Sequence, residues 1–204
     1  MSYKRAYKWL KPSNAGSYGH GDYGPYLPTH EQDPEAGWEP GLWTPKTTPI
    51  LCSSGWHVTD VAHLWNHWSA YGTLYRVECR GLAAAGKDKT AWESIRLLEP
   101  LGTLTTKVCR QFAIECAEKV LPIFEKTRPG DHRPRHAIEA AKDALRGGRR
   151  AAYAAGAAYA ANANAANAAY AAYNAANAAS SSKRADERKW QSERLLTLLQ
   201  KSDG

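Results

Sequence analysis

Apolar and polar residues alternate strictly along Thr73–Arg80. Tyr75, Val77 and Cys79 fall on one face of this segment. Leu74 and Arg76 fall on the other. A period of two over eight residues is typical of a β-strand that buries one face. The segment therefore predicts a half-buried strand.

Shorter apolar runs before this strand predict further extended pieces and one helix. Ile50–Cys52 and Trp56–Val58 are predicted to be extended, on either side of a turn at Ser53–Gly55. A helix is expected to begin at Asp60 or the preceding threonine, either of which can cap it, and to end at Gly72. Seven prolines between residues 12 and 49 exclude long helices there.

From Ala91 onward the apolar residues recur at helical spacing. Trp92, Ile95 and Leu98 predict a first helix, which Pro100 would end. A further helix is predicted to begin at Thr103 or Thr105 and to run to Phe124. Two more are predicted at 137–145 after Pro134, and through Trp190, Leu195 and Leu199.

The stretch Ala151–Ala179 holds nothing but Ala, Asn, Tyr and one Gly. Alanine has the highest helix propensity, so we expect one long helix with a bare alanine face that packs inward. Together these patterns predict an α+β protein. Residues 1–82 would form a small Trp/Pro-rich mixed α/β domain, and residues 91–200 an all-α helical bundle with the long Ala-rich helix.

The formal net charge of +7 is unevenly placed. Residues 1–81 are neutral, so the whole basic excess lies in the second half of the chain. A basic domain favours an acidic partner, either nucleic acid or an acidic protein surface, although solubility alone is a simpler explanation.

Nothing in the sequence resembles a membrane span or a secretion signal. The four cysteines are scattered, and the Ala-rich stretch carries too many asparagines to cross a bilayer. We therefore expect a cytoplasmic protein with reduced thiols and no membrane association.

Three motifs in the second half carry a family resemblance: A-E-x-V-L-P-x-F-E at Ala117–Glu125, P-G-D at Pro129–Asp131 and R-P-R-x-A-I-E-A-A at Arg133–Ala141. With the Ala-rich stretch and the tail Glu187–Gln191, they resemble the Ala-rich immunity protein family of bacterial toxin systems. The resemblance spans roughly residues 91–200. It implies a helical domain that acts by binding a partner protein.

The first half is similar to an uncharacterised module of phage and actinobacterial proteins. The matching residues are Tyr7–Trp9, Cys52–Thr59 and Leu74–Gly81. The order of a glycine, a histidine, a helix and then a strand also resembles ADP-ribosyltransferase folds. That second likeness would imply a nucleotide-binding pocket near His57.

Two groups of residues are candidate binding sites. His57 and Tyr75 could line a ligand pocket, although a structural role for the histidine is the simpler reading. In the second half, basic side chains surround one helix and could bind phosphates or an acidic surface. Alternatively, they could form ion pairs with neighbouring carboxylates. The binding candidates there are Arg128, His132, Arg133 and Arg135.

No catalytic residue, cofactor or metal is assigned. His63 and His67 have the i, i+4 spacing of a zinc pair, but no second tight pair of ligands accompanies them. The sequence therefore favours a non-enzymatic phage or bacterial protein that inhibits a partner in a toxin–immunity or anti-defence setting. The alternatives are a nucleotide-binding or ADP-ribosyltransferase-like enzyme and a basic nucleic-acid-binding protein.

Overall fold

The computed structural model describes residues 3–16, 21–33, 38–67, 71–146 and 181–202. By its internal contacts the chain divides into two compact units. The first, here called the sheet unit, comprises residues 1–104 and 199–204, and the second, the helical unit, comprises residues 105–198. The prediction of two domains at 1–82 and 91–200 stays a prediction.

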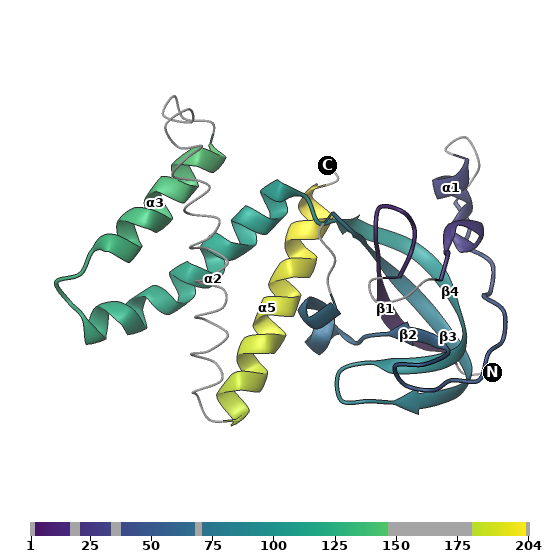
Figure 1. Cartoon of the computed structure of the whole chain (residues 1–204). Helices are drawn as coiled ribbons and strands as arrows, with labels where there is room; N and C mark the ends of the chain where they lie inside the picture. Colours follow the sequence, from purple (N-terminus) through teal and green to yellow (C-terminus); the bar gives the residue numbers. More distant parts are fainter. Residues whose placement is uncertain (1–2, 17–20, 34–37, 68–70, 147–180, 203–204) are drawn as a thin grey trace. The chain divides into compact units, whose positions relative to one another are not determined.

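The sheet unit is built on a four-stranded antiparallel sheet in the order β1-β3-β4-β2 (Figure 1). The strands are β1 (Lys4–Leu10), β2 (Trp56–Val58), β3 (Thr73–Ala85) and β4 (Thr90–Thr103). The strand predicted at 73–80 and the extended piece at 56–58 are thereby confirmed. The strand expected at 50–52 is wrong, because those residues enter a turn that a bridge between Ile50 and Ser54 closes.

The sheet curls until its two edge strands meet. Tyr7 in β1 and Thr59, the residue after β2, exchange two backbone hydrogen bonds of 2.9 Å each. The remaining edge of β4 is covered by residues 41–47, where the N–H groups of Gly41 and Thr44 donate to the carbonyls of Leu97 and Ile95, at 2.8 Å in both cases. Exposed strand edges invite association with other chains, and here they are paired.

Three short helices lie in the connections of the sheet unit: η1 (Gly24–Tyr26), α1 (Thr29–Gln32) and η2 (Val61–His67). The helix expected after Asp60 therefore exists, as a 3₁₀ helix.

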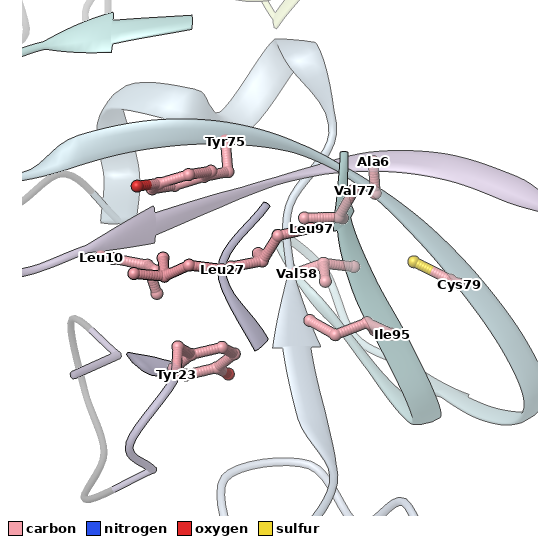
Figure 2. Close-up of a cluster of buried hydrophobic side chains, with 10 residues drawn as sticks. All are labelled: Ala6, Leu10, Tyr23, Leu27, Val58, Tyr75, Val77, Cys79, Ile95 and Leu97. Atoms are coloured by element: carbon pink, nitrogen blue, oxygen red, sulfur yellow. The ribbon is translucent and has the colours of Figure 1, made fainter. Parts of the chain in front are cut away.

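The core of the sheet unit lies inside the curl. Alternate residues of the strands point inward and meet there, as Figure 2 shows. Val77, Cys79, Ile95 and Leu97 are fully buried. The partly buried rings of Trp56 and Trp92 pack against the cluster, whose members are Ala6, Leu10, Tyr23, Leu27, Val58, Tyr75, Val77, Cys79, Ile95 and Leu97.

The helix predicted through Trp92, Ile95 and Leu98 is wrong, because these residues form β4. Along β4 the pairing with β3 skips one residue at Leu98 and another at Leu101. Each β-bulge adds a residue and shifts the inward face by one position. Buried apolar side chains then fall at Ile95, Leu97, Leu98 and Leu101, so the strand loses the strict alternation by which its sequence could have been recognised.

The helical unit contains α2 (Thr106–Thr127), α3 (Arg133–Leu145) and most of α5 (Ser181–Ser202). The helices predicted to end at Phe124, at 137–145 and through Trp190 are confirmed. Of the two starts considered for the first of them, Thr105 is right and Thr103 is wrong, because Thr103 ends β4. The Thr105 hydroxyl accepts a hydrogen bond from the Val108 N–H at 3.2 Å and caps α2.

Ion pairs join these helices. Lys142 and Arg135 on α3 pair with Glu118 and Glu125 on α2, which holds the two helices as a hairpin. Glu115 on α2 accepts two hydrogen bonds from the Arg194 guanidinium on α5, at 2.5 and 2.6 Å.

The predicted all-α bundle over residues 91–200 is wrong. Strand β4 occupies its first segment, and α3 contains no buried residue. A bundle needs each helix to bury an apolar stripe, and α3 offers mainly alanine and charged side chains in Arg133–Leu145. The Ala-rich stretch, with its predicted inward alanine face, lies outside the described residues. In the part of the chain that the structure describes, no helix is long and apolar enough to cross a bilayer.

Candidate functional site

The sheet unit contains a pocket of about 420 Å³, placed where β1, β2 and the end of the β3–β4 hairpin come together. Its polar lining includes Lys8, His57, His67 and Lys89, and its apolar lining includes Trp56. The other lining residues are Tyr7, Trp9, Gly16, Gly21, Tyr23, Thr47, Cys52, Ser53, Ser54, Gly55, Val58 and Thr59.

Lys8 is an inward-facing side chain of β1, since it lies between the buried residues Ala6 and Leu10 in the strand's period of two. Its ammonium donates a hydrogen bond to the carbonyl of His57 at 2.8 Å and lies 5.2 Å from the centre of the Tyr23 ring. Burial, and then the positive charge of Lys89, lower the pKa of the Lys8 amine to about 8.

His57 is fixed by the turn that precedes β2. The backbone N–H of Cys52 donates to His57 Nε2 at 3.0 Å, so this nitrogen is the acceptor and the ring proton sits on Nδ1. Cys52 has a positive φ of 60° in this turn. Burial, followed by the charges of Lys8 and Lys89, lowers the pKa of His57, so the imidazole is neutral at pH 7.

The two histidines at the spacing of a zinc pair engage different carboxylates. His63 Nδ1 lies 2.7 Å from Asp60 Oδ1, and His67 Nε2 lies 3.1 Å from Asp88 Oδ2. Burial is the largest influence on His67 and lowers its pKa, against the opposing charge of Asp88. Among the described residues, no three His, Cys, Asp or Glu side chains gather as a metal site would require.

Tyr75 does not line the pocket that contains His57. Its hydroxyl donates to Glu31 Oε2 at 3.3 Å, and burial together with Glu31 raises its pKa. Glu78, the one acid inside that strand's alternating run, is paired with Arg96 at 2.7 Å. The structure therefore does not bring His57 and Tyr75 together in one pocket.

The turn between α2 and α3 holds the basic candidates of the second half. Arg133 Nε and Nη2 donate to the two carboxylate oxygens of Asp131, at 2.8 and 2.7 Å. The hydrogen bond from Arg133 lowers the pKa of Asp131 to about 2. Arg135 makes the same two-pronged contact with Glu125, at 2.8 and 2.7 Å.

These contacts give the two arginines different structural roles. Arg135 holds the hairpin together, whereas the Arg133 side chain remains 86% exposed despite its partner. Arg128 and His132 are exposed on the same turn, and Ile123 on the last turns of α2 is 67% exposed. We call Ile123, Arg128, His132 and Arg133 the turn surface.

Sequence reasoning missed Lys8 and Lys89 as site residues. The signal was present in β1, where a lysine takes the inward position between Ala6 and Leu10. This signal is useful only if residues 4–10 have first been recognised as a strand. Lys89 carries no local signal, because the β3–β4 hairpin positions it.

Residues 99–180 match the model of the family described as Imm-5 like putative immunity protein. The resemblance of the second half to that family is therefore confirmed, and the match associates this part of the chain with immunity proteins. No curated protein and no solved structure matches the chain significantly. The similarity of the first half to a phage and actinobacterial module stays a prediction.

Proposed function

We propose that this chain is a non-enzymatic bacterial or phage protein that binds a partner protein and inhibits it, in a toxin–immunity or anti-defence setting. The family match over residues 99–180 carries this proposal, because it includes α2, α3 and the turn between them. The partner would be a toxin or defence protein, bound through an acidic surface.

The turn surface is the contact that we propose for this partner. Interface centres are rich in arginine and in apolar side chains that can be desolvated together. Ile123 supplies an exposed apolar side chain, while Arg128 and Arg133 supply charge. Asp131 holds the Arg133 guanidinium in one orientation, which reduces the entropy that binding would cost.

The two alternatives differ in what they would bind. A nucleic-acid-binding role would use the basic excess of the second half and would weaken steeply with salt. An enzyme of the nucleotide-binding or ADP-ribosyltransferase-like class would use the pocket near His57. We favour the protein inhibitor because only its class is supported by a family match.

Partner capture tests the proposal. The tagged full-length protein should retain one partner from lysate of its native host, identified by mass spectrometry and then purified for binding measurements. Replacing Arg128 and Arg133 together by glutamate should weaken that binding by at least about 100-fold, because two favourable charge contacts become repulsive. Arg135 is not altered, since its bond to Glu125 supports the hairpin.

The matched control is Arg146→Glu. Arg146 is an exposed arginine after the other end of α3, with Asp143 as its neighbour at 3.4 Å. Reversing the charge of Arg146 should change the affinity for the partner by less than about threefold. Equal losses in both variants would indicate general electrostatic attraction, and retention of DNA or RNA in place of a protein would favour the nucleic-acid alternative.

A further inference from the structure

We propose that the pocket of the sheet unit binds a phosphomonoester, with the phosphate held by Lys8 and Lys89 and the organic group against Trp56. This site lies in the sheet unit, apart from the turn surface, and does not depend on the proposed inhibition of a partner.

The first argument is charge. The described lining contains two lysines and two histidines and no carboxylate. Among the described residues, Asp88 pairs with the lining residue His67 at 3.1 Å, and no ion pair joins a carboxylate to Lys8 or Lys89. Two ammonium groups, with no carboxylate among the described lining residues, concentrate positive potential where a ligand would sit.

The second argument is the state of Lys8. In the described structure its ammonium donates to a neutral carbonyl, that of His57, at 2.8 Å. Taking an ammonium out of water is costly unless an opposite charge accompanies it. Burial, and then the positive charge of Lys89, lower the pKa of Lys8, as this cost requires. An anion between them would relieve both the desolvation and the repulsion.

The third argument concerns the charge and size of the ligand. A phosphomonoester carries close to two negative charges at neutral pH, since its second pKa is about 6, and so balances two ammonium groups. A carboxylate or a sulfate ester carries only one. A volume of about 420 Å³ exceeds what a bare phosphate occupies and lies in the range of small-molecule pockets.

The walls supply contacts for the organic group. Tyr23 and Trp56 meet edge to face with their ring centres 5.3 Å apart, which presents an apolar wall beside the cations. Ser53 adds a hydroxyl to the lining. The neighbouring Ser54 hydroxyl donates to the Thr48 carbonyl at 2.5 Å, and the Thr59 hydroxyl donates to the Asp88 carbonyl at 3.1 Å.

The test compares three probes of one shape and different charge: phenyl phosphate, phenyl sulfate and phenol. Each is titrated into the full-length protein at pH 7.5, with Trp fluorescence or amide chemical shifts as the readout. Phenyl phosphate should bind at least about tenfold more tightly than phenyl sulfate, and phenol more weakly still. Equal binding of the two anions, or no binding of phenyl phosphate at millimolar concentration, would overturn the proposal.

Two variants and a matched control place the site. Lys8→Met and Lys89→Met should each weaken phenyl phosphate binding by at least about tenfold, since each removes a charged contact. Lys87→Met alters an exposed lysine two residues from Lys89 that does not line the pocket, and should leave the affinity within about twofold. Should Lys8→Met fail to fold, Lys89→Met alone decides. Unchanged affinity in a folded Lys89→Met variant would contradict the assignment.

Discussion

Replacing Gly41 by alanine is expected to destabilise the protein by at least about 3 kcal/mol. A Cβ atom at this position would lie 1.9 Å from the carbonyl oxygen of Tyr26 and 3.0 Å from the carbonyl carbon of Leu27. Both neighbours are backbone, so no rotamer change relieves the overlap. The Gly41 N–H is bonded to the Leu97 carbonyl at 2.8 Å, which prevents the loop from moving away without losing its hold on β4.

Urea unfolding followed by tryptophan fluorescence measures this effect. Gly130→Ala is the matched control, because nothing lies within 4 Å of a Cβ placed at Gly130 in the α2–α3 turn. That substitution should change the free energy of unfolding by less than about 0.5 kcal/mol. If Gly41→Ala were as stable as the wild type, the coverage of β4 by residues 41–47 would be wrong.

The second large effect is on the pH dependence of stability. The pKa of Lys8 is about 8 in the folded protein and about 10.5 in the unfolded chain. Between these values the unfolded chain binds more protons, so the contribution of Lys8 to the free energy of unfolding rises as the pH rises. Below pH 8 the folded protein carries the full penalty of the partly buried charge, and above pH 10.5 the penalty is gone.

Comparison with Lys8→Met isolates this contribution. Buried thiols such as Cys79 and Cys116, whose pKa burial raises to about 12, lower stability above about pH 9 in both proteins and cancel in the difference. From pH 7 to pH 9.5 the wild type should gain about 1–2 kcal/mol relative to Lys8→Met, a range whose lower end allows for partial exposure of the amine.

Urea midpoints and slopes of the two proteins at pH 7, 8, 9 and 9.5 provide the measurement. The groups that face Lys8 are Lys89, His57 and Tyr23. Burial lowers the pKa of His57 and raises that of the Tyr23 hydroxyl, so neither changes charge in the folded protein over this range. A stability difference that stays constant over this range would mean that Lys8 is solvated, and would remove one support for an anion site.

The sequence predicted those parts of the fold where local pattern and tertiary structure agree. Strand β3 keeps its alternation where Tyr75, Val77 and Cys79 enter the core, and α2 has both a capping threonine and a helical period. Strand β4 could not be predicted from its period. Its bulges at Leu98 and Leu101 depend on pairing with β3, which a local window does not contain.

The candidate sites were predictable to different degrees. The basic residues around the α2–α3 turn are close in sequence, and a motif therefore finds them. The motif does not tell which of these arginines supports the fold. The contact between Arg135 and Glu125 shows that Arg135 does. The pocket joins Lys8, His57 and Lys89 from three segments through the pairing of β1 with residue 59. The sequence suggested that Tyr75 lines a pocket together with His57, and in the structure the Tyr75 hydroxyl is bonded to Glu31 instead.

Growth rescue tests the central claim most directly. The captured partner is expressed from an inducible promoter, alone and together with this protein, and the colonies that survive are counted. The inhibitor account predicts that the partner arrests growth alone and that co-expression of the wild type restores it. The Arg128→Glu/Arg133→Glu variant, expressed at the same level, should not. Arrest that the wild type fails to relieve, or relief that the double variant gives equally well, would contradict the account.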